Sequence, residues 1–253
     1  MKEHKAIKTG LHHLLFIFLI HLSANAYSQV TRVEFIHAKD IDKYLQIERE
    51  WKPIHQQRLE NEQIYGRYVL KKHYSGTEDG YNLGIVTIFP SLGAIGYPKT
   101  TEPDLKQRME ASREIVKVEI YDTPLFLEII SLPQFLNMEF MKVEEGKDND
   151  YLVLEDEVWK PAHADMKKRG ALTTWSVYRQ LYPGGYGGEY NYVVVNGFAD
   201  KKKVTFEPAV GWDEVLKTVH PGIDLAKTYQ QTFDTRVLVR TELWEILDKV
   251  TPQ

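Results

Sequence analysis

The 253-residue sequence contains no cysteine. This absence excludes disulfide bonds, thiol catalysis, zinc sites with cysteine ligands and a bacterial lipid anchor, which needs an acylated cysteine. Stability must therefore come from a hydrophobic core, and 43% apolar residues are enough to build one. The sequence also lacks a nucleophile elbow, a phosphate-binding loop and an HExxH motif, and His37, His73 and His220 have no metal-ligand spacing. No metal site is predicted.

Positive charge is also scarce. Lys and Arg number 32 against 36 Asp and Glu, which gives a formal net charge of −4. The basic block Lys201–Lys203 is short and stands where a loop is expected. Because nucleic-acid binding depends on neutralising phosphates, the composition predicts no nucleic-acid partner.

The N-terminus has the order of an export signal. Three Lys and one Glu come first, then the apolar run Leu14–Leu22, then Ala24-Asn25-Ala26. The run is shorter than the roughly 20 apolar residues that span a bilayer. We therefore expect residues 1–26 to be a cleaved signal peptide. Cleavage would remove three Lys and one Glu, shifting the net charge from −4 to −6. The mature chain is predicted to be periplasmic or secreted, with no membrane span.

One phrase occurs twice, as Trp51–His55 (WKPIH) and as Trp159–His163 (WKPAH). Further matches keep the same order: Glu48 with Asp156, Tyr74 with Tyr182, Tyr81 with Tyr190, and Phe89 with Phe198. Colinear matches indicate an internal repeat of domain size. The sequence therefore predicts two diverged copies of one unit, at 27–133 and 134–253.

Each copy shows the same order of strand-like and helix-like segments. Gly-rich turns separate its two middle β-runs, which indicates hairpins. In the first copy the segments are strand Thr31–His37, the WKPIH helix, strands Tyr65–Tyr74 and Tyr81–Phe89, helix Glu102–Val116 and strand Leu125–Ile130. In the second they are strand Phe135–Val143, the WKPAH helix, strands Leu172–Tyr182 and Tyr190–Phe198, helix Trp212–Arg236 and strand Leu243–Leu247. The β-α-β-β-α-β order predicts an α+β fold of two tandem ferredoxin-like units.

A β-α-β-β-α-β unit with a Trp-Lys-Pro-x-His phrase on its first helix resembles the dimeric α/β-barrel superfamily. That superfamily includes NIPSNAP-like and EthD-like proteins and antibiotic-biosynthesis-type monooxygenases. The resemblance implies that the two antiparallel sheets pair into a barrel, here within one chain. Members include cofactor-free oxygenases, haem-handling enzymes and proteins of no known activity, so it identifies neither an activity nor a cofactor.

A helical wheel places polar residues on the apolar face of both first helices. Glu48 and His55 fall in the sector of Trp51. Asp156 and His163 fall in the sector of Trp159 by the same rule. Burying such groups without partners costs several kcal/mol. The sheet residues that could pair with them are Arg67, Tyr68 and Tyr81 in the first copy, and Arg179, Tyr178 and Tyr192 in the second.

Two interpretations of these residues stay open. In the first, each histidine is a structural hydrogen-bond donor, and Glu48–Lys52 and Asp156–Lys160 are ordinary i,i+4 pairs. In the second, one histidine faces a cavity as general base or acid, or ligates a metal or haem iron. The catalytic candidates are then His163 and His55, and the Gly- and Tyr-rich loop of the second copy favours His163. The binding candidates are Trp51, Trp159, Glu48, Asp156, Tyr178 and Tyr192.

These observations predict an exported α/β barrel that binds a small apolar or aromatic molecule in a helix–sheet cavity. Cofactor-free or haem-related oxygenase chemistry is an expectation from the resemblance. The alternative is a non-catalytic binding or assembly protein with structural histidines. The sequence leaves self-association open.

Overall fold

The computed structural model describes residues 29–74, 80–100, 102–129, 131–204 and 210–252. The predicted signal peptide, residues 1–26, lies outside the described residues.

In this part of the chain, eight antiparallel strands form a closed barrel in the order β1-β3-β2-β8-β5-β7-β6-β4. The first half of the chain contributes β1 (Val30–His37), β2 (Gly66–His73), β3 (Leu83–Phe89) and β4 (Glu114–Phe126). The second half contributes β5 (Phe135–Val143), β6 (Thr174–Tyr182), β7 (Tyr192–Phe198) and β8 (Arg236–Val250). The α+β class and the closed antiparallel barrel agree with the sequence prediction.

The two halves meet at two strand pairs. Within each half, the first strand is central: β1 pairs with β3 and β4, and β5 pairs with β7 and β8. β2 then pairs with β8, and β4 pairs with β6. Each joint therefore combines strands from opposite halves of the chain.

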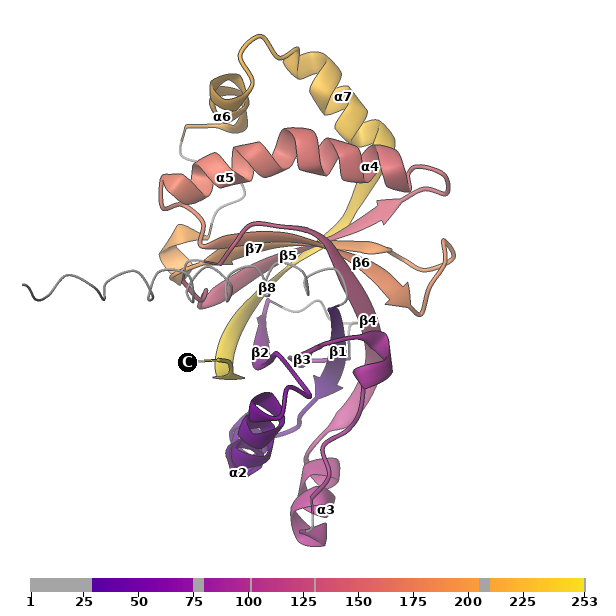
Figure 1. The fold of residues 1–253 in the computed structure, drawn as a ribbon, viewed down its shortest axis with the longest axis vertical. Helices are drawn as coiled ribbons and strands as arrows, with labels where there is room; N and C mark the ends of the chain where they lie inside the picture. Colours follow the sequence, from indigo (N-terminus) through magenta and orange to yellow (C-terminus); the bar gives the residue numbers. More distant parts are fainter. Residues whose placement is uncertain (1–28, 75–79, 101, 130, 205–209, 253) are drawn as a thin grey trace, which may run out of the picture.

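The helices lie outside the barrel. The first half has α2 (Ile41–Glu60) and α3 (Pro103–Ser112), and the second has α4 (Asp148–Leu154), α5 (Lys160–Lys168), α6 (Trp212–Val219) and α7 (Leu225–Thr235). A π-helical turn, η2 (Glu155–Trp159), joins α4 to α5, and short 3₁₀ turns form η1 (Leu92–Ala94) and η3 (Lys201–Lys203). Figure 1 shows α2 and α3 on one side of the barrel and α4 to α7 on the opposite side. Each half therefore covers the outer face of its own sheet.

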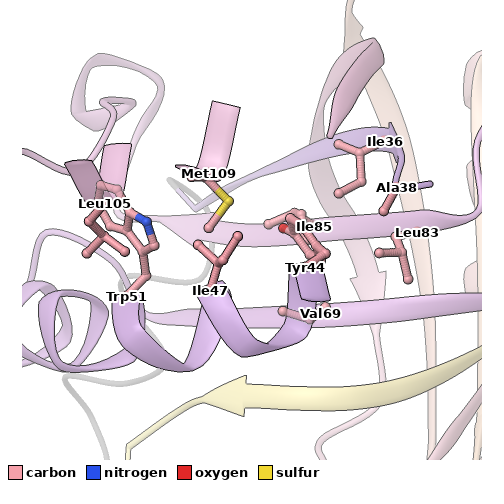
Figure 2. Close-up of a cluster of buried hydrophobic side chains, with 10 residues drawn as sticks. All are labelled: Ile36, Ala38, Tyr44, Ile47, Trp51, Val69, Leu83, Ile85, Leu105 and Met109. Carbon is pink, nitrogen blue, oxygen red and sulfur yellow. The ribbon is translucent and has the colours of Figure 1, made fainter. Parts of the chain in front are cut away.

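Helix α2 begins at a capped end and packs through one apolar face. The side chain of Asp40 accepts a hydrogen bond from the backbone N–H of Lys43 at 3.0 Å, which satisfies a free donor of the first turn. Tyr44, Ile47 and Trp51 recur at helical spacing and are buried against the sheet. Figure 2 shows these side chains projecting from α2 toward the sheet, with Met109 of α3 pointing at them.

The last strand of each half begins earlier than the sequence predicts. β4 begins at Glu114 and β8 at Arg236, where the helical segments Glu102–Val116 and Trp212–Arg236 were expected to continue. Of the predicted strand Leu125–Ile130, only the first two residues belong to β4. The prediction was wrong because Lys117 and Glu119 of β4 and Arg240 and Glu242 of β8 were not taken as strand residues, although those of β4 alternate with Val116, Val118 and Ile120.

Inside the barrel, hydrogen bonds cross reciprocally between the halves. Tyr81 of the first half donates to Glu242 on β8 at 2.7 Å. Tyr190 of the second half donates to the carboxylate of Glu119 on β4 at 2.7 and 2.8 Å. Lys72 of β2 also donates to Glu242 at 3.1 Å. Since all these groups are buried, the crossing bonds hold the two sheets together.

Candidate functional site

A cavity of about 760 Å³ lies between the helices of the first half and the outer face of its sheet. We call it the first cavity. Because residues of a strand alternate between faces, β1 presents Arg32 and Glu34 to this cavity and Phe35 to the barrel interior. The other residues that carry its chemistry are Glu48, Trp51, His55 and Arg58 of α2, Arg67 of β2, Met109 of α3 and Arg113 at the end of α3.

Glu48 forms a buried ion pair in the first cavity. Its side chain is 2% exposed. Arg67 donates from Nη2 to Oε1 at 2.9 Å, and its Nη1 lies 2.9 Å from Oε2. The hydroxyl of Tyr44, one turn earlier, donates to the same carboxylate. The structure thus joins Glu48 to Arg67, one of the sheet partners named from the sequence.

A second acidic group, Glu34, holds two further arginines. Its Oε1 lies 3.1 Å from Nη2 of Arg32, and its Oε2 lies 3.4 Å from Nη1 of Arg113. Nε and Nη1 of Arg32 are buried and have no hydrogen-bond partner among the described residues. Sequence reasoning missed these residues. The signal was available: Arg32 and Glu34 are charged residues at alternating positions of an otherwise apolar strand.

Arg58 stands next to Arg32. Both guanidinium groups lie over the ring of Phe89, at 5.8 and 5.3 Å from its centroid. Arg58 donates from Nη2 to the carbonyl of Gly96 at 2.9 Å. Burial lowers the pKa of Arg58 to about 10, and the positive charges of Arg32 and Arg67 add to the shift. Arg32 and Arg58 are therefore two nearby cations, and of the two only Arg32 pairs with a described carboxylate, that of Glu34.

His55 points into the first cavity, as the wheel predicts. It is buried, and its Nδ1 has no hydrogen-bond partner within the described part of the chain. Burial lowers the pKa of His55 to about 2, and Arg67 and Arg58 are the leading arginines that lower it further. Its imidazole is therefore neutral at physiological pH. Trp51, whose ring centroid lies 6.1 Å away, also has an unpartnered buried Nε1 and forms part of the apolar wall.

A second cavity, of about 230 Å³, lies at the corresponding place in the other half. His163 lines it, but its Nδ1–H donates to the carbonyl of Trp159 at 2.7 Å. The imidazole stacks on Trp175 with a centroid distance of 5.1 Å. Burial lowers the pKa of His163 to about 4. Trp159 is also engaged, since its Nε1 donates to Thr232 at 3.2 Å. His163 and Trp159 are thus held by the protein itself.

Asp156 does not lie on the buried face where the wheel placed it. Its side chain is 49% exposed and accepts a hydrogen bond from Lys160 at 2.7 Å. The reason is the π-helical turn η2, which inserts one extra residue and rotates the helix surface. Glu155 takes the inner position instead and is buried.

Glu155 is the counterpart of Glu48 that sequence reasoning missed. Nε of Arg236 lies 3.3 Å from its Oε1 without forming a hydrogen bond. Burial raises the pKa of Glu155 to about 7, an effect that Arg236 opposes and Glu139 strengthens. A signal existed, because Tyr151 precedes Glu155 by four residues, as Tyr44 precedes Glu48.

The two tyrosine candidates line neither cavity. Tyr178 borders a small apolar space inside the barrel and contacts Tyr121 edge-on. Tyr192 packs on Tyr151, and its hydroxyl donates to Asp148 at 2.8 Å. The structure therefore brings together Trp51, Glu48 and His55, but not the complete set of candidates from the second half.

Iron ligation, which some members of the resembled superfamily use, does not fit these histidines. A metal ion at His55 would stand among four arginines, and Nδ1 of its imidazole has, among the described residues, no carboxylate or carbonyl partner of the kind that orients metal-bound histidines. His163 does have such a carbonyl partner, that of Trp159, but the cavity that it lines is small, at about 230 Å³. Among the described residues, no group of three or more His, Asp or Glu side chains is placed to hold a metal ion. Within the same part of the chain, every helix is too short or too polar to cross a lipid bilayer.

Comparison with known proteins supports the fold alone. No family model matches the chain, and neither does any curated protein. Among solved structures, a candidate monooxygenase from Lactobacillus acidophilus NCFM matches with a TM-score of 0.55 at 10% identity, over 88% of this chain and 96% of its own. A candidate monooxygenase from Fusobacterium nucleatum subsp. nucleatum matches with a TM-score of 0.54 at 11% identity, over 88% of this chain and 94% of its own. An anthrone oxidase-like protein matches with a TM-score of 0.50 at 10% identity, over 88% of this chain and 93% of its own. The chain therefore has the ferredoxin-like α/β-barrel fold of these proteins.

Proposed function

We propose that the protein binds a small, partly apolar molecule in the first cavity. Its volume of about 760 Å³ lies within the range of about 300–1,000 Å³ that is typical of ligand sites. Trp51, Ile85 and Met109 supply apolar walls. Two nitrogens of Arg32 supply donors, and Nδ1 of His55 supplies a donor or an acceptor according to its tautomer; none of the three has a partner among the described residues. These buried, unused polar atoms carry the proposal, because native proteins rarely leave such groups without a partner.

The two cavities differ in ways that favour the first. The second has less than a third of its volume, and the rings of Trp175 and Trp212 contact the imidazole of His163. The interpretation of a structural histidine therefore suits His163, and the interpretation of a site histidine suits His55. This assignment reverses the preference for His163 in the sequence analysis.

We also propose that the halves, residues 27–133 and 134–253, arose by tandem duplication. The element order supports this, as does the shared series of Tyr, Glu, Trp and His along the first helices. The second series is one residue longer, and the π-helical turn η2 accommodates that residue. A position near the NIPSNAP-like proteins stays a prediction from the resemblance.

Cofactor-free oxygenation in the first cavity stays a prediction as well, with His55 as its base. Its test is oxygen consumption by the purified protein with a bound aromatic substrate, compared with a His55→Gln variant. The alternative is a non-catalytic binding or assembly protein. Oxygen consumption no faster than in a protein-free control would favour the alternative, and equal consumption above that level by both proteins would show that His55 is not the base.

Export and self-association are further proposals with direct tests. Intact mass and N-terminal sequencing of the protein recovered from its host would show whether the chain begins after Ala26. Light scattering over a range of concentrations would show whether the protein associates with itself.

Ligand-observed NMR with a panel of small aromatic compounds tests the binding proposal. We expect binding by the wild type and loss of binding in Met109→Trp, which places an indole in the first cavity. Met166→Trp is the matched control, because Met166 lines the second cavity in the same manner. Binding that survives Met109→Trp, or no binding from the whole panel, would overturn the proposal.

A further inference from the structure

We infer that the ligand of the first cavity is an organic anion, whose carboxylate or phosphate lies between Arg32 and Arg58 and beside His55. The inference rests on the proposed function, because it assigns a chemical class to the ligand of that same cavity. The sequence predicts only a small apolar or aromatic molecule.

The distribution of charge is the first observation. Six cationic side chains line the first cavity against three carboxylates. Glu48 compensates Arg67, and Glu34 is shared between Arg32 and Arg113. Arg58 makes no ion pair with any described carboxylate. The inner part of the cavity therefore carries more positive than negative charge, in a place where burial weakens solvent screening.

The unpartnered donors are the second observation, and they stand in the same place. Arg32 is buried between the rings of Phe89 and Tyr97, at 5.3 and 4.4 Å from their centroids, which restrict its movement. Its Nε and Nη1 are left without acceptors. Arg58 also lies over the Phe89 ring, 5.8 Å from its centroid, and the nearby charge of Arg32 lowers the pKa of Arg58. Two adjacent guanidinium groups repel each other unless an acceptor stands between them, and anionic oxygens are their strongest acceptors.

The remaining walls indicate what carries the anionic group. Trp51, Ile85, Met109 and Ile115 give the cavity an apolar lining in addition to the arginines. A ligand that fills both regions therefore combines one anionic head with an aromatic or branched apolar body. An inorganic anion would satisfy the arginines alone and leave the apolar side in water.

The protonation of His55 provides a second readout. The surrounding arginines help to keep its imidazole neutral. A bound anion would offset their charge, so binding should raise the pKa of His55.

The test compares compounds of matched shape on the intact protein. Benzoate and phenyl phosphate carry the two anionic heads, benzamide is neutral and benzylamine is cationic. We expect an anion to bind to the wild type at least about tenfold more tightly than benzamide, as charge-assisted hydrogen bonds predict. Whether benzoate or phenyl phosphate binds more tightly distinguishes the two heads.

Variants locate the anion. Arg58→Gln should remove the preference for anions, whereas Arg179→Gln should keep it, because Arg179 pairs with Asp122 away from both cavities. Binding of an anion should also move the ring signals of His55 in the titration of the wild type. Loss of the preference with benzamide still bound is the expected outcome for Arg58→Gln.

The possible failures are distinguishable. If benzamide binds to the wild type as tightly as both anions, the cavity binds small molecules but the anion inference is wrong. The same conclusion follows if Arg58→Gln and Arg179→Gln behave alike. If none of the compounds binds, the proposed function itself fails. The wild-type comparison does not depend on whether Arg58→Gln folds.

Discussion

Replacing Glu48 with Gln should destabilise the protein strongly, although it changes only one side-chain atom. Glu48 is 2% exposed and faces Arg67, which is also buried. The substitution keeps the shape of the side chain and removes its charge. Arg67 then stays buried without a counter-ion, and the hydroxyl of Tyr44 loses an anionic acceptor.

The expected loss follows from this burial. Breaking one side of a buried ion pair costs about 3–5 kcal/mol, since the remaining charge cannot regain its hydration. In a chain of this size each kcal/mol corresponds to about 2–4 °C in melting temperature. Glu48→Gln should therefore lower the melting temperature by about 6–20 °C.

The assay is urea denaturation at pH 7, followed by circular dichroism and tryptophan fluorescence together. Glu155→Gln is the matched control, because burial already raises the pKa of Glu155 to about 7 and part of the population is neutral at that pH. We expect the control to lose little or no stability. If Glu48→Gln loses no more free energy of unfolding than Glu155→Gln does, the ion pair between Glu48 and Arg67 does not stabilise the fold.

Three further predictions concern other parts of the fold. Because burial raises the pKa of Glu155 from 4.5 to about 7, the folded state keeps a proton that the unfolded chain releases in this range. The free energy of unfolding should therefore fall by about 3 kcal/mol between pH 4.5 and 7 through this group. Denaturation of Glu155→Gln across the same pH range should lack that part of the fall. Gly197→Ala should cost about 1–3 kcal/mol in thermal unfolding, because its Cβ would stand 2.5 Å from a threonine methyl, whereas Gly93→Ala, with nothing within 4 Å, should cost little. Glu242→Gln should cost about 3–5 kcal/mol, because it removes the buried charge that pairs with Lys72 and Arg240 and accepts a hydrogen bond from Tyr81; a loss below about 1 kcal/mol in urea would contradict that role of the crossing bonds.

The order of strands and helices could be predicted because it leaves local marks on the sequence. Alternating apolar residues and Gly-rich turns mark the hairpins, and the WKPIH phrase lies on a helix that passes through Pro53. The starts of β4 and β8 could not be predicted in this way. Glu119 and Glu242 point into the barrel, where tyrosines of the opposite half satisfy them. A buried glutamate with a distant partner has the same appearance in a sequence as one in solvent.

The candidate site could be predicted in one half only. The wheel places Trp51, Glu48 and His55 correctly because α2 is a regular helix. It misplaces Asp156 because a π-helical turn changes the angle per residue, and no residue type announces that turn. Arg32 was missed for a different reason. Its significance comes from neighbours far along the chain, such as Phe89 and Tyr97, and from the acceptor that it lacks.

The strand pairs β2–β8 and β4–β6 have a consequence for how the barrel withstands dilution. A barrel assembled from two separate chains falls apart at low concentration, whereas the connection between Phe126 and Phe135 keeps these two sheets at a high effective concentration. Cutting the chain at that connection would leave each fragment with two bare strand edges. Such unpaired edges can form intermolecular β-sheets with other chains, including a second copy of the same fragment.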